Sequence, residues 1–394
     1  MSGSENALFL TRDFNESDVS NVENEQDFQA APADFEELSL SSSDWTVETL
    51  HSQIVKGNID LCPAFQRRGV WDTSKKSAFI ESLVMNIPVP QIVLAKKPDS
   101  RGEYLVLDGK QRLLSLKGYY AGDFAVRKDG LIPELNGKKY ADLDDDVKDA
   151  LDNSTIRAVR LSQWKSEAVL YAIFHRLNTG SVPLNTQELR SALLSGPFTN
   201  YAADFTEKDF TLAMLLNSSA DGPDFRMRDI ELFTRYCGVT RMPELFQGNL
   251  REFLDNTTRR LNSCFDPSQY ESFANDMVRT IDLYREVYRL IDKDSPTFSL
   301  IQPGKNTRFN RAVFDALCFP CKDVWVRESL NRHREQVSAS LSMLLRNQDF
   351  INSCSLSTKT RASLERRIGL WADCLTGILG PEVQVPRLSL NDGD

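Results

Sequence analysis

Residues 108–112, which read Asp-Gly-Lys-Gln-Arg, have the types and spacing of a phosphate-binding turn. They follow a short apolar run and precede a leucine-rich segment, a pattern that predicts a strand, a tight turn and a helix. Gly109 permits the turn and a close backbone approach, and the first N–H groups of the helix carry the positive end of its dipole. Lys110 and Arg112 add cationic donors for phosphate oxygens, and Asp108 could bind Mg²⁺ or orient a water. Because Asp-Gly also starts many plain turns, a purely structural role is the alternative.

A second polar cluster lies at residues 65–71, Phe-Gln-Arg-Arg-Gly-Val-Trp. Arg67 and Arg68 could face phosphate or nucleic acid, and Trp71 could stack on a base. The alternative is that both arginines are solvated and that Trp71 belongs to the hydrophobic core. On the first hypothesis the cluster joins the turn at residues 108–112 in one site.

A third polar cluster spans residues 176–188, where two predicted helices meet. Asn185 or Thr186 can cap the second helix, and Glu188 lies in its first turn, where the helix dipole favours a carboxylate. Capping alone would explain these residues, and a contribution to the phosphate site is the competing hypothesis.

The elements that position these clusters alternate between strands and helices up to about residue 200. A polar excursion at residues 126–154, which contains Asp142 and Asp144 to Asp146, interrupts the pattern. Strands are predicted at residues 59–61, 91–95, 104–107 and 155–161, and helices at 46–56, 74–86, from about 110, 165–177 and 185–195.

Beyond residue 200 the apolar residues recur with helical spacing, and no strong strand pattern is present. The predicted fold is therefore α+β, with an α/β domain at residues 46–200 and an all-helical domain at residues 201–394, behind a disordered acidic tail at residues 1–45. Helices are predicted at residues 226–237, 244–261, 268–292, 308–318, 325–347 and 359–378.

The formal net charge of −9 is concentrated at the N-terminus. Residues 1–45 hold eleven acidic residues and one base, a net charge of −10, which leaves +1 on the rest of the chain. Such an acidic segment is usually disordered. The near-neutral body leaves room for a basic phosphate site, and the tail could occupy that site as a mimic of phosphate.

The composition is typical of a globular protein and excludes collagen-like and wholly disordered chains. No stretch is apolar enough for a membrane helix, and residues 1–5 lack the basic start and apolar core of a secretion signal, so we expect a cytoplasmic protein without a membrane partner. Seven scattered cysteines fit a reducing compartment. Cys318 and Cys321 form the only C-x-x-C pair, and none of the three histidines has ligand spacing to it, so we predict no metal site there.

Four motifs in order resemble the N-terminal domain of GmrSD-type modification-dependent restriction endonucleases. They are P-x-F-Q-R-x-x-V-W, a helix ending in N-I-P-V-P, the strand followed by D-G-K-Q-R-L-L-S-L, and F-H-R-L-N-T-G-x-V-P-L-N-x-Q-E-L-R. The resemblance covers about residues 46–200. It implies a ParB/sulfiredoxin-like fold with a D-G-Q-Q-R motif, a nucleoside triphosphate site at that turn, and a role in bacterial defence against phage or modified DNA. The positions that match the family signature are Asp108, Gly109, Gln111, Arg112, Gln66, Arg67, Asn178 and Glu188.

The resemblance suggests a division of roles among these residues. Gly109, Lys110 and Arg112 would hold the phosphates, with Gln66, Arg67 and Asn178 as further nucleotide-binding residues. Asp108 or Glu188 would bind Mg²⁺ or position a water, and Gln111 would orient the nucleophile. Lys110 departs from the family motif, which usually has glutamine there. The change adds a phosphate-compatible charge but removes any hydrolytic role of that glutamine.

GmrSD-type enzymes usually continue into an HNH nuclease domain, whose chemistry needs a histidine base and metal ligands. After residue 200 the only histidine is His333, on a charged predicted helix. We therefore predict no nuclease in this chain and a separate nuclease or effector, encoded nearby, as its partner; oligomers are compatible with this arrangement.

The leading hypothesis is a nucleotide-binding, NTP-hydrolysing subunit of a defence system. A second hypothesis is a ParB-like DNA-binding or sensing module with nucleotide as a mere ligand, in which Arg67, Arg68, Arg157 and Arg160 form a basic patch. A third is a protein-interaction regulator that docks through the tail or the helical domain. Kinase-like phosphoryl transfer is a minority alternative. The sequence does not identify the preferred base.

Overall fold

The chain divides into two compact units, Phe28–Ser195 and a second unit that includes Gly196–Asp394. Each unit has its own core and is described separately. The computed structural model describes residues 32–61, 71–97, 102–177, 186–264, 266–294, 296–300, 308–356, 358–380 and 382–389.

A five-stranded mixed sheet forms the centre of the first unit, in the order β1-β5-β3-β4-β2. β3 pairs in parallel with β5 and antiparallel with β4, β1 pairs antiparallel with β5, and β2 is parallel to β4. The strand that precedes the Asp-Gly turn therefore lies inside the sheet, between β3 and β2. The strands are β1 (Ser39–Thr46), β2 (Ile59–Asp60), β3 (Ile92–Lys96), β4 (Tyr104–Asp108) and β5 (Thr155–Ser162).

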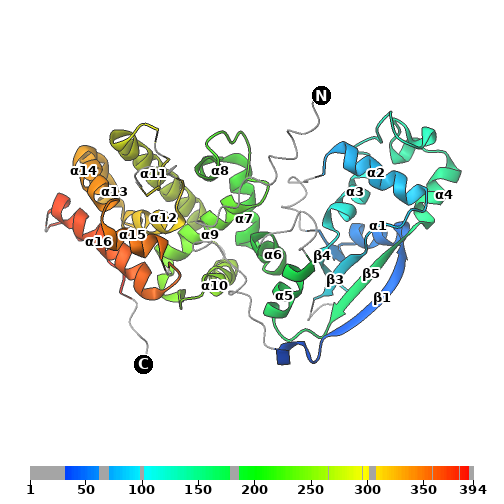
Figure 1. The fold of residues 1–394 in the computed structure, drawn as a ribbon, viewed down its shortest axis with the longest axis horizontal. Helices are drawn as coiled ribbons and strands as arrows, with labels where there is room; N and C mark the ends of the chain where they lie inside the picture. The colour runs from blue at the N-terminus through cyan, green and yellow to red at the C-terminus, as the bar shows by residue number, and fades with distance from the viewer. Residues whose placement is uncertain are drawn as a thin grey trace. The chain divides into compact units, whose positions relative to one another are not determined.

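Helices cover both faces of this sheet (Figure 1). Alternate residues of β3 and β4 enter two separate cores, as the two-residue repeat of a strand requires. Leu94 and Val106 pack with α1 to α4, whereas Val93 and Leu107 pack with α5 and α6. The helices are α1 (Val47–Val55), α2 (Thr73–Val84), α3 (Lys110–Tyr120), α4 (Asp145–Asn153), α5 (Glu167–Leu177) and α6 (Thr186–Leu193), with short 3-10 turns at Pro32–Phe35, Pro133–Leu135 and Tyr140–Asp142.

The predicted α/β class of this region is confirmed, but one local prediction is wrong, and one helix lies in a segment for which the sequence pattern predicts no element. The prediction of disorder over residues 1–45 is wrong for its last part, because Ser39–Thr46 forms β1 and pairs along its whole length with β5. The serine-rich strand has no apolar alternation, so its sequence pattern does not predict a strand, and only its pairing with β5 identifies it. The polar excursion at residues 126–154 contains α4: Asp144 is its N-cap residue, and Asp145 and Asp146 lie in its first turn, where the dipole favours them.

The second unit is helical, as predicted, and no strand longer than the single bridge between Ser299 and Phe309 occurs in its described residues. α9 is the central helix, since every residue from 229 to 240 is buried. The helices are α7 (Pro197–Lys208), α8 (Thr211–Leu216), α9 (Arg228–Arg241), α10 (Leu250–Ser263), α11 (Pro267–Ile291), α12 (Arg311–Cys318), α13 (Val324–Arg332), α14 (Arg334–Leu344), α15 (Gln348–Ser355) and α16 (Arg361–Leu379), with 3-10 turns at Pro243–Leu245 and Pro320–Lys322.

The prediction of one helix at residues 325–347 is wrong, because the chain breaks at His333 between α13 and α14. The Nδ1 atom of His333 lies 2.8 Å from the carbonyl oxygen of Ser329, so the side chain closes the end of α13. Where the structure is described, no helix is both long and apolar enough to cross a bilayer.

Candidate functional site

The Asp-Gly turn joins β4, which ends at Asp108, to α3, which begins at Lys110. Gly109 has a φ of 92°, in the left-handed region that favours glycine. A Cβ atom at this position would lie 2.5 Å from Cγ2 of Ile92 on β3, closer than real Cβ contacts. Glycine is therefore required twice, by the backbone conformation and by the close approach of the neighbouring strand.

The N-terminus of α3 has no side-chain cap, because its N-cap residue is Gly109. An α-helix of this length leaves its first N–H groups without intrahelical partners and presents the positive end of its dipole. Lys110 begins the helix and is only 8% exposed, so its charge is held against the protein rather than in open solvent. Helix N-termini with these features commonly bind anions.

Asp108 and Arg112 form an ion pair across this turn, with 3.1 Å between Nη2 and Oδ2. The same Nη2 atom donates to the carbonyl oxygen of Gln91 at 3.0 Å, which fixes the guanidinium against the residue before β3. The Nε atom of Arg112 is buried and has no hydrogen-bond partner within the described residues. The side chain of Arg112 is 12% exposed and that of Asp108 33%, so the carboxylate can be reached from solvent.

Gln111 connects the motif to Trp71, the last residue of the second polar cluster. Its Oε1 atom accepts a hydrogen bond from the backbone N–H of Trp71 at 3.4 Å. The Trp71 ring packs edge-on against Phe79, with 5.8 Å between ring centroids, at the border of the core. Of the two alternatives for Trp71, the structure favours core packing.

Glu188 lies in the first turn of α6, a helix that packs on β4. Its side chain is buried, with 8% exposed. Sequence reasoning missed Arg190, which is fully buried and donates from Nη1 to Oε1 of Gln187 at 2.7 Å. Arginine is rarely buried unless it is paired. The position of Arg190 in the Q-E-L-R segment is the sequence feature that could have identified it.

The remaining predicted site residues Gln66, Arg67, Arg68 and Asn178 lie outside the described residues, so their roles stay predictions.

The basic patch suggested for DNA does not form on β5 as predicted. Arg157 and Arg160 are three positions apart on a regularly paired strand, so they point to opposite faces of the sheet. Arg157 lies 3.4 Å from the hydroxyl of Ser42, whereas Arg160 lies over the ring of Trp45. The two arginines therefore cannot share one DNA-binding surface.

Cys318 and Cys321 are fully or almost fully buried in the second unit. Burial raises the pKa of both thiols, that of Cys321 to about 12, and Cys321 lies 3.7 Å from the hydroxyl of Tyr284. These contacts are those of core side chains. Across the described ranges, no group of three or more His, Cys, Asp and Glu residues is arranged to hold a metal ion.

A comparison with family models matches most of the first unit. Residues 47–195 match the family model of the GmrSD restriction endonuclease N-terminal domain. This confirms the resemblance inferred from the four motifs and indicates a component of a restriction system. The match includes the β4–α3 turn and α6 and ends where the second unit begins. No curated protein and no solved structure matches the chain.

Proposed function

We propose that the GmrSD-like domain binds a nucleoside triphosphate with Mg²⁺ at the β4–α3 turn and hydrolyses it within an antiviral restriction system. The observation that carries the proposal is the combination at Gly109 of a left-handed backbone, a missing side chain and an uncapped helix N-terminus. Together these features leave room for a phosphate beside backbone donors and two cationic side chains.

The ion pair of Asp108 and Arg112 suggests how phosphate and metal would bind together. The Arg112 guanidinium is partly committed to Asp108 and Gln91, but its Nε atom still has donor capacity. An incoming phosphate would replace the carboxylate as the partner of Arg112. Asp108 would then be released to bind Mg²⁺, so that the nucleotide and the metal enter by one exchange of partners.

Gln111 and Glu188 are the residues that we propose for the hydrolytic step. Gln111 occupies the first turn of α3 and can orient a water beside the phosphates, and Glu188 supplies a carboxylate from α6. The hydrogen bond from Trp71 to Gln111 gives the glutamine a fixed orientation.

Nucleotide binding and turnover test this function. The purified protein is mixed with each of the four radiolabelled ribonucleoside triphosphates with and without Mg²⁺, beside the variants Asp108→Ala and Arg112→Ala. We expect binding of at least one nucleotide by the wild type, loss of about tenfold or more in affinity for Arg112→Ala, and loss of Mg²⁺ dependence for Asp108→Ala. Lys117→Ala, in the last turn of α3, is the matched control and should bind like the wild type. Equal binding and turnover by all four proteins would refute the proposal.

We propose in addition that DNA cleavage belongs to a separate nuclease or effector subunit. The support is the scarcity of histidine in the second unit and the role of His333 at the end of α13. Co-purification with the product of an adjacent HNH-bearing gene, followed by cleavage assays of modified phage DNA, tests this arrangement. Cleavage by this chain alone, abolished by Asp108→Ala or by His333→Ala, would contradict it.

A further inference from the structure

β1 forms a long outer edge of the sheet in the first unit (Figure 1). All eight residues of this strand, Ser39–Thr46, pair with β5 on one side, and no described strand pairs with it on the other side. The opposite edge of the sheet is β2, which has only two residues. Because an unpaired edge presents a row of backbone donors and acceptors, a further strand can be added to it. β1 is therefore the edge at which the sheet can be extended.

The pairing with β5 determines which backbone groups of β1 point outward. The N–H of Val47, the residue after the strand, donates to the carbonyl oxygen of Ser154 at 2.9 Å, which fixes the phase of the ladder. Successive residues of a strand direct their backbone groups to opposite sides, so the odd-numbered residues of β1 face β5. The N–H and C=O groups of Leu40, Ser42 and Asp44 therefore point away from the sheet. These groups have no hydrogen-bond partner among the described residues.

β1 lacks the features that usually prevent an edge strand from pairing with another chain. It contains no proline and no lysine, and its register with β5 continues without a bulge. Its first four residues are exposed, and Leu40 among them is 64% exposed. Asp44 is the one charged residue of the strand. The side chains of β1 therefore present little obstacle to a partner strand.

Two charges at this edge indicate which strand it would accept. Asp44 of β1 and Arg157 of β5 are opposite each other in the register, and both are exposed. The guanidinium of Arg157 nevertheless turns toward Ser42, with 3.4 Å between Nη2 and the hydroxyl oxygen. Neither charge forms an ion pair with a described residue. A partner strand that carries both signs of charge would complement this edge.

We propose that β1 pairs antiparallel with β1 of a second copy of this chain, about a two-fold axis at Ser43. Such an interface is closed, because each copy presents the same surface to the other. With the axis at Ser43, Asp44 of each copy lies opposite Ser42 of the other copy and therefore beside its Arg157 guanidinium. Both unpaired charges gain an opposite charge, whereas an axis at Ser42 would place Asp44 opposite Leu40. The dimer is independent of the nucleotide proposed for the β4–α3 turn.

Analytical ultracentrifugation of the full chain over a range of micromolar concentrations tests the dimer. Asp44→Lys and Arg157→Glu each bring like charges together across the interface and should raise the dimer dissociation constant about tenfold or more. An equimolar mixture of these two variants should dimerise again, because each new charge then faces an opposite charge on the other copy. The two substitutions are in different molecules, so a repair within one chain does not explain this result. Asp149→Lys, the same charge change on exposed α4, is the matched control and should dimerise like the wild type.

Disulfide formation tests the position of the two-fold axis. The axis brings the two copies of Ser43 together as a non-hydrogen-bonded pair, with about 4.5 Å between their Cα atoms, a separation that a disulfide can span. Ser43→Cys should therefore form a covalent dimer under mild oxidation, whereas Ser41→Cys, which would face Trp45 of the other copy, should not. The oxidised wild type measures any cross-linking through the native cysteines. A wild type that stays monomeric, a mixture of the charge variants that does not dimerise, or equal cross-linking of the two cysteine variants would overturn the proposal.

Discussion

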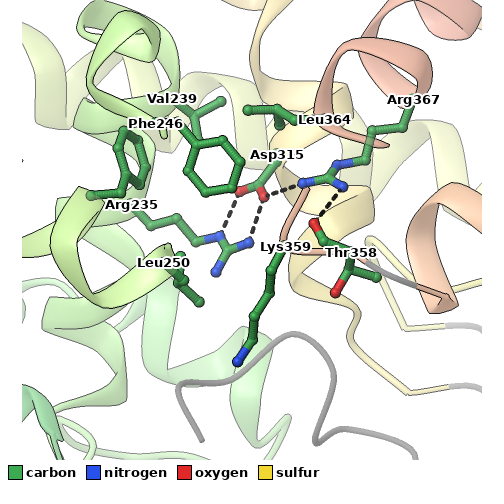
Figure 2. A pocket seen from close by; sticks show the side chains of 10 residues that line it. Arg235, Val239, Phe246, Leu250, Asp315, Thr358, Lys359, Leu364 and Arg367 are labelled. Atoms are coloured by element: carbon green, nitrogen blue, oxygen red, sulfur yellow. Dashed lines mark hydrogen bonds and ion pairs between the residues drawn. The ribbon is translucent and has the colours of Figure 1, made fainter. Parts of the chain in front are cut away.

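The two units each contain an arginine paired with an aspartate, but the pairs differ in burial and in stoichiometry. At the β4–α3 turn, one arginine meets one carboxylate that is 33% exposed. Around Asp315, Arg235 and Arg367 share one carboxylate (Figure 2), and all three side chains are at most 5% exposed. An accessible pair can exchange its partner for a ligand, whereas a buried pair must stay intact for the helices around it to pack. The same residue types can therefore support binding in one unit and architecture in the other.

Removing the buried carboxylate gives the largest effect that this comparison predicts. Asp315→Ala leaves two guanidinium groups buried without their acceptor, and we expect the free energy of unfolding to fall by about 3–5 kcal/mol. Asp108→Ala removes a part-exposed partner and should cost about 1 kcal/mol or less. Urea unfolding measures both values. Similar losses for the two variants would show that burial does not distinguish these ion pairs.

Replacing the glycine of the β4–α3 turn should have the next largest effect. Gly109→Ala adds a methyl group 2.5 Å from Ile92 to a backbone with positive φ. We expect the free energy of unfolding to fall by about 2–4 kcal/mol and nucleotide binding to be lost. Gly57→Ala is the matched control, because Gly57 also has a positive φ but nothing lies within 4 Å of its added Cβ. The free energy of unfolding of Gly57→Ala should fall by about 1–2 kcal/mol, and its nucleotide binding should be retained. Retained binding in a folded Gly109→Ala protein would contradict the close approach of phosphate.

The role of the Arg112 guanidinium at the β4–α3 turn can be tested with little disturbance of the fold. Arg112→Lys keeps the charge but loses the bidentate donor set, so nucleotide affinity should fall about tenfold while stability changes by less than about 1 kcal/mol. Arg157→Lys makes the same exchange on the exposed side of β5 and should leave affinity unchanged. Isothermal titration with each protein measures the difference. A large stability loss without an affinity change would assign Arg112 to structure, like Arg235.

The smallest predicted effect is a loss of stability of the first unit at alkaline pH. Burial raises the pKa of Tyr119 to about 12 from 10.0, so above about pH 10 the unfolded chain ionises while the folded protein keeps its proton. This contribution to stability is complete below pH 10 and is lost as the pH rises toward 12. Tyr119→Phe cannot ionise and should show a shallower fall in the urea midpoint between pH 9 and about pH 11 than the wild type. If the urea midpoints of the two proteins fall in parallel with pH, the raised pKa of Tyr119 is contradicted. The difference between their midpoints at pH 8 corrects for the lost hydroxyl.

The sequence by itself determined the elements with strong periodicity and the local chemistry of the turn. β3, β4 and the helices of the first unit other than α4 follow from apolar spacing, and the glycine after Asp108 indicated a left-handed turn before a helix. These features depend on interactions between residues close together in the chain, which a pattern records directly. The family match at residues 47–195 agrees with motifs that are also local.

Only the tertiary structure decided the features that depend on distant partners. β1 has no apolar repeat and exists because β5 pairs with it, and the face on which Arg157 or Arg160 lies depends on strand register. The burial of Arg190, the contact of Trp71 with Phe79 and the sharing of Asp315 by two arginines depend on packing between separate elements. Burial changes the energy of a charge by several kcal/mol. The sequence shows which charges are present, and the fold decides which of them are compensated.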